Sequence, residues 1–552
     1  MLKKILLAIV SVFVMGSSAH STTWDDTLQG NITTTVTLQN TKRYLMLGTI
    51  FVKQGGNLVI PAGTQLFGDK ISKATIVVER GGMIHANGTA VAPVIFTSSQ
   101  PVGNRATGDW GGIILLGRAR INTASGSDTA AIEGIAPSVY YGGNNDNDNS
   151  GVMRYCRIEY SGIALSANNE INGLTMGGVG SGTTIEYIMV SWNGDDSFEW
   201  FGGTVNCKYL ISYIPVDDEF DTDFGFRGKV QWGLAIRKPS VADISGSTCF
   251  ESDNNNGPNY NTPRTQPIFS NITSVGPKQY DTSAVNPLFT RGGHLRRNSL
   301  ISLVNSVVMG WPQGIYYDGS GTTCAMQNDT CRVKANVFAG CYTLASSTNA
   351  GCGFNALVYT TAGGNTIIAN TAGAQLSNPY GNISSGSYSP ANFYPSAGSP
   401  VLSGANFTLP GMNDPFFTQT TYRGAFDQNS TWANGWTNFR PDTIDYKTIP
   451  IGIEPISNIV PGSYNLHQNY PNPFNPTTNI RFDVSQSGFV KLAVFDILGR
   501  EIQTLVSENV KAGEYQISFN ASNLPSGVYF YRLTVSNASA PWTATKKLVL
   551  VK

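Results

Sequence analysis

Two acidic segments in the middle of the chain could bind a cation or perform acid–base chemistry. The first contains Asp195, Asp196 and Glu199, and a second segment repeats its pattern 22 residues later. If the two segments occupy neighbouring coils of one structure, their carboxylates come close together and repel each other. Such repulsion raises the pKa of some acids or requires a bound cation. The aligned pairs are Asp195 with Asp217, Asp196 with Asp218, and Glu199 with Asp221.

Ca²⁺ is the cofactor that this set of six acids predicts. It takes six to eight oxygen ligands and tolerates irregular geometry, which suits stacked carboxylates. The alternative is a solvated corner, in which the same acids accept hydrogen bonds from backbone N–H groups. The sequence leaves both interpretations open.

Basic residues follow the second acidic segment and allow a catalytic interpretation. Arg227 and Lys229 come within a few residues of Asp221. This combination resembles the polysaccharide lyases built on β-helices. In those enzymes Ca²⁺ neutralises an acidic sugar, and a basic side chain removes the proton next to its carboxylate. The candidate catalytic residues are therefore Arg227, Lys229 and Asp217. Paired carboxylates could instead serve glycoside hydrolysis, which needs separations of about 5 Å or about 6.5–9.5 Å.

A second candidate metal site lies in the Asn/Asp-rich segment 144–151. Asp146, Asp148 and Ser150 before Gly151 match the start of a Ca²⁺ loop of the EF-hand kind. The twelfth position of that loop is Arg157, where a bidentate Glu is expected. A plain Asn/Asp turn is therefore the competing interpretation.

The composition restricts the remaining classes of function. Lys plus Arg and Asp plus Glu both total 36, so no overall field attracts nucleic acid or an anionic membrane. Histidine contributes only 4 residues, and the sequence holds no nucleophile elbow and no phosphate-binding loop. We therefore expect no nucleic-acid partner, and histidine chemistry is nearly excluded.

An oxidising compartment would permit disulfides between the cysteines of this chain. The chain has 7 of them, an odd number that leaves at least one free thiol. The short spacings predict two loop disulfides, although connectivity cannot be fixed from the sequence alone. The candidates are Cys324 with Cys331 and Cys341 with Cys352.

The acidic pair belongs to a longer internal repeat. Tyr187 to Glu199 matches Tyr209 to Asp221, and a segment beginning at Tyr155 aligns 32 residues before Tyr187. Short apolar runs with Gly and Asn corners are typical of solenoid coils, each of which buries its apolar face against the next. We predict an all-β chain in which residues 22–439 form a right-handed parallel β-helix with an irregular C-terminal part. Tyr187 should lie directly above or below Tyr209.

The two ends of the chain differ from this repeat. Lys3 and Lys4 before a short apolar run predict a signal peptide over residues 1–21, because the run is too short to span a bilayer. Prolines over 440–461 predict a linker. Several short strands with turn signals predict a small β-sandwich over 462–552. No later segment is long and apolar enough for a transmembrane helix in the mature chain.

The C-terminal segment also carries several motifs in a fixed order. Together they resemble the type A C-terminal sorting domain of the type IX secretion system. The resemblance implies the secretion machinery as a partner and export across both membranes of a diderm bacterium, usually with removal of the domain. The motifs are Tyr464–Phe482, Leu492–Glu501, Ala512–Tyr515, Leu524–Leu533 and Lys546–Lys552.

The core region resembles a family of surface-exported β-helix proteins that carry this kind of sorting domain. That family has no assigned reaction, so the resemblance supports the fold and leaves the function open. The residues that carry it are Gly108–Ile114, Arg157–Gly162, Asn169–Thr175, Asp195–Glu199 and Asn305–Gly310.

These features predict a secreted or cell-surface protein of binding or structural type, with glycan recognition as one role. A Ca²⁺-dependent polysaccharide lyase or glycoside hydrolase acting through residues 195–229 is the alternative, and an adhesin is a third. Besides the secretion machinery, the expected partner is a cell-surface or extracellular polysaccharide.

Overall fold

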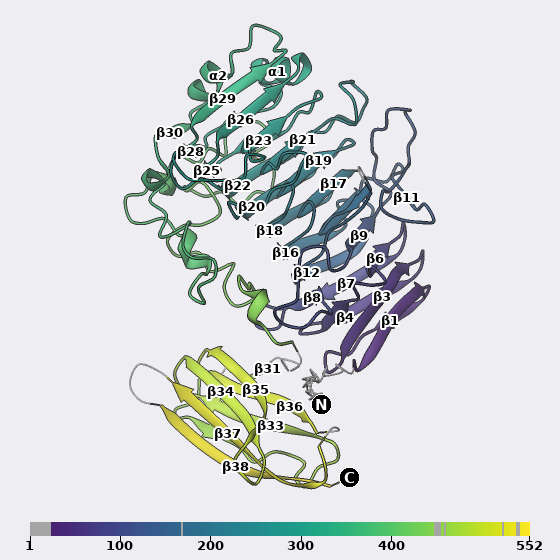
Figure 1. The fold of residues 1–552 in the computed structure, drawn as a ribbon, viewed down its shortest axis with the longest axis vertical. Helices are drawn as coiled ribbons and strands as arrows, with labels where there is room; N and C mark the ends of the chain where they lie inside the picture. The colour runs from purple at the N-terminus through teal and green to yellow at the C-terminus, as the bar shows by residue number, and fades with distance from the viewer. Residues whose placement is uncertain are drawn as a thin grey trace, which may run out of the picture.

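The computed structural model describes residues 24–166, 169–446, 454–457, 460–521, 524–536 and 541–551. They form a long parallel β-helix and a smaller antiparallel C-terminal domain (Figure 1). The predicted all-β fold, with a parallel β-helix before a β-sandwich, is confirmed. The predicted signal peptide lies outside the described residues.

Each coil of the β-helix adds strands to three parallel ladders, named here faces A, B and C. Face A contains β2 (Thr35–Thr37), β4 (Asn57–Pro61), β7 (Met83–Asn87), β24 (Ser302–Val304) and β27 (Val333–Lys334). Face B contains β5 (Gln65–Gly68), β8 (Val94–Ser98), β25 (Val307–Met309), β28 (Val337–Ala339) and β30 (Thr366–Ile368). Five long strands cross from face A to face B: β12 (Gly151–Glu159), β16 (Thr184–Ser191), β18 (Asn206–Tyr213), β20 (Lys229–Ile236) and β22 (Ile268–Val275).

Face C is the third ladder, and it carries both acidic segments. Two strands, β1 (Asp26–Ile32) and β3 (Arg43–Val52), start the β-helix and span faces B and C. The rest of face C consists of β6 (Thr75–Val78), β9 (Gly112–Leu116), β15 (Leu174–Val179), β17 (Phe198–Gly203), β19 (Phe220–Asp223), β21 (Phe250–Ser252), β23 (Gly293–Leu295), β26 (Gln313–Asp318) and β29 (Thr343–Thr348).

A left-handed residue bends each long strand at the corner between faces A and B. Tyr155, Tyr187 and Tyr209 have φ values of 49°, 56° and 61°. This conformation costs an L-residue about 1–2 kcal/mol, and ring stacking offsets part of that cost. The ring centroids of Tyr155 and Tyr187 are 4.1 Å apart, and those of Tyr187 and Tyr209 are 4.2 Å apart. The prediction that Tyr187 lies directly next to Tyr209 in the adjoining coil is therefore confirmed.

The core is a column of apolar side chains along the axis of the β-helix. Phe198, Phe220 and Phe250 occupy matching positions in successive coils, with centroid separations of 5.8 Å and 5.6 Å. All three are almost completely buried. The 22-residue repeat thus arises from a requirement for large apolar side chains at fixed positions of each coil.

After β30 the chain runs back along faces A and B as a strap, residues 369–446. It packs on outward apolar residues of face B, including Met189, Ile211 and Leu234. At its end the hydroxyl of Tyr446 donates to the buried carboxylate of Glu159 at 2.8–2.9 Å. The first part of the predicted linker therefore packs on the β-helix. The short helices of the strap are η1 (Thr371–Ala374), η2 (Pro390–Phe393), η3 (Pro400–Leu402) and η4 (Pro441–Thr443).

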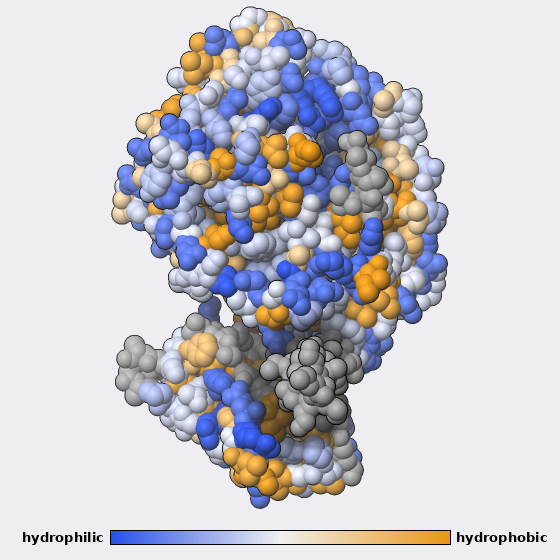
Figure 2. Space-filling model, viewed as in Figure 1, coloured by the Kyte–Doolittle hydropathy of each residue, from blue (hydrophilic) through white to orange (hydrophobic). Residues whose placement is uncertain are grey.

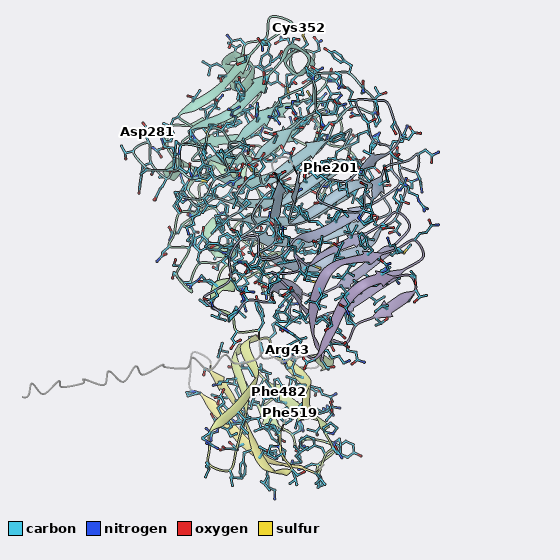
Figure 3. The ribbon with its side chains drawn as sticks, turned by 45° about the vertical axis from the view of Figure 1, so that its right-hand side comes forward. Arg43, Phe201, Asp281, Cys352, Phe482 and Phe519 are labelled. Atoms are coloured by element: carbon cyan, nitrogen blue, oxygen red, sulfur yellow. A yellow bond between two sulfur atoms is a disulfide. The ribbon has the colours of Figure 1, made fainter. Side chains whose placement is uncertain are left out.

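The predicted cysteine pairs are wrong. Cys324 forms a disulfide with Cys352, while Cys331 and Cys341 are free. Cys324 lies in helix α1 (Ser320–Gln327), whereas Cys331 points into the apolar core after that helix ends. Helix α2 (Ala356–Ala362) follows Cys352. Figure 3 shows Cys352 at the end of the β-helix opposite Arg43.

The C-terminal domain is a sandwich of two four-stranded antiparallel sheets. Residues of both sheets share one apolar core, in which Phe482 and Phe519 are completely buried (Figure 3). The first sheet contains β31 (Glu454–Ser457), β32 (Asn465–Leu466), β33 (Thr477–Val484) and β36 (Gly513–Asn520). The second contains β34 (Gly488–Phe495), β35 (Glu501–Val510), β37 (Gly527–Ser536) and β38 (Trp542–Leu550).

Among the described residues, the structure contains no helix with the length and apolar character needed to cross a membrane.

Candidate cation-binding face

Face C carries a continuous column of polar side chains on its outer surface. Phe198 and Trp200 of β17 point into the core, so Glu199 between them points outward. The parallel register continues this position through β19, β21, β23 and β26. Because neighbouring strands lie about 4.8 Å apart, these side chains are direct neighbours. In order they are Glu199, Asp221, Glu251, His294 and Tyr316.

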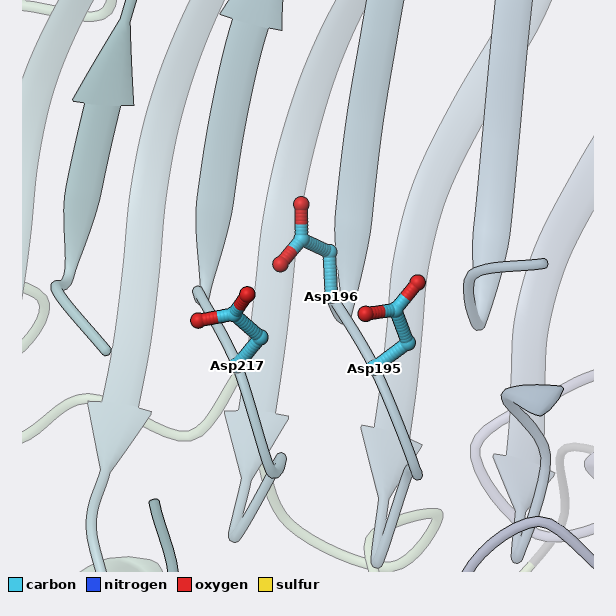
Figure 4. Close-up of side chains that lie close together, drawn as sticks. All are labelled: Asp195, Asp196 and Asp217. Atoms are coloured by element: carbon cyan, nitrogen blue, oxygen red, sulfur yellow. The ribbon is translucent and has the colours of Figure 1, made fainter. Parts of the chain in front are cut away.

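More carboxylates lie where the chain turns into β17 and β19. Oxygen atoms of Asp195, Asp196 and Asp217 all lie within 4.8 Å of one another (Figure 4). Asp196 forms a second group of the same kind with Glu199 and Asp221. The structure therefore brings five of the six predicted metal ligands together, and Asp196 belongs to both groups.

The sixth predicted ligand is Asp218, which lies outside both groups. Its carboxylate accepts a hydrogen bond from the backbone N–H of Thr248. The backbone N–H of Asp218 in turn donates to Oδ1 of Asp196 at 2.7 Å. Asp218 thus links the acidic turn to the next coil and holds Asp196 in place.

Burial and mutual repulsion act together on these acids. Burial raises the pKa of Asp196, and the charges of Asp217 and Asp218 raise it further. Burial, followed by the charges of neighbouring acids, also raises the pKa of Glu199. For Asp217, burial raises the pKa to about 6, although the hydroxyl of Ser245 donates to its Oδ2 at 2.7 Å. A cation among these oxygens would offset the cost of ionising them.

Two loops cover the neighbouring part of face C. The hairpin of β10 (Ala130–Ala131) and β11 (Tyr140–Tyr141) packs apolar residues on β9 and β17. A second hairpin consists of β13 (Ile163–Ser166) and β14 (Asn169–Ile171). The loops bring the charge of Glu133 to act on Glu199 and that of Glu170 to act on Asp195. Burial followed by the charge of Glu170 raises the pKa of Glu133 to about 7.

Sequence reasoning missed the basic end of the same column. His294 Nδ1 lies 3.4 Å from Glu251, and Arg296 pairs with both Glu251 and Asp253. His294 lies 43 residues after Glu251 in the chain, so no short motif connects them. The structure therefore places His294 in the candidate site, although the sequence had nearly excluded histidine chemistry.

The predicted catalytic bases face other parts of the molecule. Arg227 Nη2 lies 3.0 Å from Asp146, and Lys229 Nζ lies 3.1 Å from Asp414. The chain leaves face C after β19, and Lys229 already begins β20 on face A. Nearness to Asp221 in the sequence thus did not bring these side chains to the acidic groups.

The second predicted metal site is different. Neither carboxylate group that the described residues form contains Asp146 or Asp148. Asp146 pairs with Arg120 and Arg227, and Asp148 accepts a hydrogen bond from the backbone N–H of Arg118 at 2.9 Å. Positive partners within the chain already neutralise Asp146. This loop therefore fits the alternative interpretation, an Asn/Asp turn.

Hydrophilic residues gather around a hollowed strip in the upper part of Figure 2, in the region of β19, β21 and β23. The strap packs on faces A and B, whereas the polar column lies on face C.

Comparison with known families agrees with this geometry. Residues 30–437 match the pectate-lyase like β-helix domain, which is more than half of the chain. The chain therefore belongs to this family. Residues 468–551 match the secretion system C-terminal sorting domain. The protein is thus a secreted or cell-surface protein of a diderm bacterium, exported by the type IX system. No curated protein and no solved structure matches the chain.

Proposed function

We propose that the protein binds acidic polysaccharide outside the cell, through Ca²⁺ at the acidic groups of face C. The observation that carries this proposal is the pair of overlapping carboxylate groups that share Asp196. Carboxylate oxygens are the ligands that Ca²⁺ prefers, and its flexible coordination leaves positions for a sugar carboxylate. The cation would then bridge two anionic partners that otherwise repel each other.

The form of face C favours a polymer as the ligand. Its outward side chains repeat about every 4.8 Å along the axis, so an extended chain lying along the β-helix meets a new residue at every coil. The family description, pectate-lyase like, and the extracellular location support an acidic glycan.

Thermal unfolding and polymer binding test the proposal together. Ca²⁺ should raise the melting temperature, and polygalacturonate should bind in Ca²⁺ but not in EGTA. Asp217→Ala should weaken both effects. Asp414→Asn is the matched control, because Asp414 pairs with Lys229 away from the acidic groups. A melting temperature that stays constant up to millimolar Ca²⁺ would return these acids to a solvated-corner role.

A Ca²⁺-dependent polysaccharide lyase is the second candidate, and His294 is the observation that favours it. His294 lies next to Glu251 on the column that also carries Asp221, two coils beyond that acid. Arg296 is less suited to accept a proton, because Glu251 and Asp253 raise its pKa against the effect of burial. Removal of the C5 proton next to the sugar carboxylate, with cleavage of the C4–O4 glycosidic bond and protonation of the leaving oxygen by water, creates a C4–C5 double bond that absorbs ultraviolet light. Product that forms in the wild type and is lost in His294→Gln, with polymer binding retained, would establish catalysis.

A further inference from the structure

Arg291 belongs to a second column on face C, formed by the turn residues two positions before Phe198, Phe220, Phe250 and Gly293. It lies two residues before Gly293, which pairs with Phe250, just as Asp218 lies two residues before Phe220. Going along the axis, this column therefore runs from Asp196 and Asp218 through Thr248 to Arg291, which lies two coils beyond Asp218. The neighbouring column changes in the same direction, from Glu251 to His294.

The guanidinium of Arg291 is held in place but still has free donors. Its Cζ lies 4.5 Å from the centroid of the Tyr316 ring, and its Nε donates to Thr290 Oγ1 at 3.1 Å. A guanidinium has five N–H donors, so most of the fork is left for another acceptor. The side chain is only partly buried, which keeps these donors within reach of a ligand.

Other arginines nearby are already paired. Arg296 contacts Glu251 and Asp253, and Arg297 Nη1 lies 2.7 Å from Asp253. Among the residues that the structure describes, no carboxylate lies within 4.0 Å of Arg291, and burial lowers its pKa although Glu251 and Asp318 act in the opposite direction. Arg291 is thus a positive charge that the fold positions without an anion.

We propose that Arg291 recognises the oxyanion of the bound polysaccharide, a carboxylate or a sulfate, at a subsite beside the cation groups. A planar guanidinium binds such groups through two parallel hydrogen bonds, and the Tyr316 ring fixes its plane. The inference rests on the proposed function and adds the residue that selects charged over neutral glycans.

Equilibrium binding to three immobilised polymers tests this subsite in the full-length protein. The polymers are polygalacturonate, dextran sulfate and neutral dextran, each with Ca²⁺ and with EGTA. Arg291→Gln should lower the affinity for the charged polymers about tenfold or more, because charge-assisted bidentate bonds are lost. Arg291→Lys should recover part of it. The Ca²⁺-dependent rise in melting temperature should stay unchanged in both variants. Arg154→Gln is the control, since Arg154 pairs with Glu186 on face A.

The outcomes separate the two proposals. If Arg291→Gln binds like the wild type while binding still needs Ca²⁺, the subsite is wrong and the proposed function stands. If the variant is weak but binding does not need Ca²⁺, the subsite stands and the role of the cation falls. Equal binding of neutral dextran, or no polymer binding at all, overturns the subsite. A weaker response to polygalacturonate alone assigns it to carboxylates, and a weaker response to dextran sulfate alone assigns it to sulfates.

Discussion

Faces B and C are built from the same coils and share one core, yet in the middle coils their outer surfaces differ in character. On face B the outward residues Met189, Ile211 and Leu234 are apolar, and the strap buries them completely. On face C the outward residues of the neighbouring ladder are Glu199 and Asp221. The inward positions of a coil are therefore fixed by the core, while each outward position is suited to what covers it.

The difference extends to what completes each face. The chain itself supplies the cover of face B, through Trp436 and the other apolar residues of the strap. On face C two carboxylate groups lie close together. Among the described residues, no basic side chain forms an ion pair with Asp195 or Asp196. Face B is thus complete in the folded chain, whereas the proposal for face C requires an external partner.

The largest loss of stability is expected when a buried side chain between the strap and face B is removed. Trp436 is completely buried, and its ring meets those of Tyr155 and Tyr187 edge-on at 5.9 Å and 6.1 Å. Trp436→Ala should lower the free energy of unfolding by about 3–5 kcal/mol, because it removes a large buried side chain and leaves a cavity. Urea denaturation followed by tryptophan fluorescence measures this. Leu357→Ala, at a side chain that is 55% exposed, should stay within about 0.5 kcal/mol of the wild type. Similar results for both variants would show that the strap does not stabilise face B.

A somewhat smaller effect on stability is expected when Ca²⁺ binds to face C. A ligand that binds only the native state stabilises it by about 2.7 kcal/mol at a hundredfold excess over Kd. Ca²⁺ should therefore stabilise the wild type, and Asp196→Asn should remove more of that gain than Asp217→Asn or Asp221→Asn. The reason is that Asp196 belongs to both carboxylate groups. Calorimetry with and without EGTA measures the gain, and equal losses in the three variants would contradict a shared ligand.

The end of the strap can be tested by removing one oxygen atom. The hydroxyl of Tyr446 donates to Glu159, a carboxylate that is 0% exposed. Tyr446→Phe should cost about 1–3 kcal/mol, because a buried acceptor loses a partner. Tyr140→Phe is the control, since Tyr140 is 51% exposed. Chemical denaturation of both variants gives the comparison, and an unchanged Tyr446→Phe would show that the clasp is unimportant.

The smallest expected effect is the contribution of Asp217 to the pH dependence of stability without Ca²⁺. The folded pKa of Asp217 is raised from 3.8 to about 6, so the native state holds a proton that the unfolded chain has lost in this interval. Stability in EGTA should therefore fall as the pH rises from about 4 to about 6 and stay lower above it. At about 1.4 kcal/mol per pKa unit the shift of Asp217 corresponds to about 3 kcal/mol, and solvent screening of this partly exposed side chain reduces the effect to about 1 kcal/mol.

Asp217→Asn should make this slope shallower, because an amide does not titrate while neighbouring acids with raised pKa values, such as Asp196 and Glu199, still do. Urea denaturation at several pH values measures it, with Asp414→Asn as the control. A wild-type slope of the opposite sign would mean that positive groups already stabilise the ionised form of the acidic groups.

The sequence determined the fold because its signals are local and periodic. The 22-residue offset between Tyr187 and Tyr209 follows from a coil that must repeat its apolar positions, and the same offset placed Asp195 beside Asp217. The motifs of the C-terminal domain are likewise short and ordered, so its β-sandwich and its role in export could be predicted.

Only the tertiary structure decided the composition of the site. Face C strands are 30 residues apart between Phe220 and Phe250 and 43 between Phe250 and Gly293, because loops of different length are inserted between coils. These insertions hid the alignment of His294 and Arg291 with the acids. They also explain why Arg227, near Asp221 in sequence, instead pairs with Asp146. Periodicity is set by the core and can be read along the chain, whereas contacts on an outer face depend on loops that follow no period.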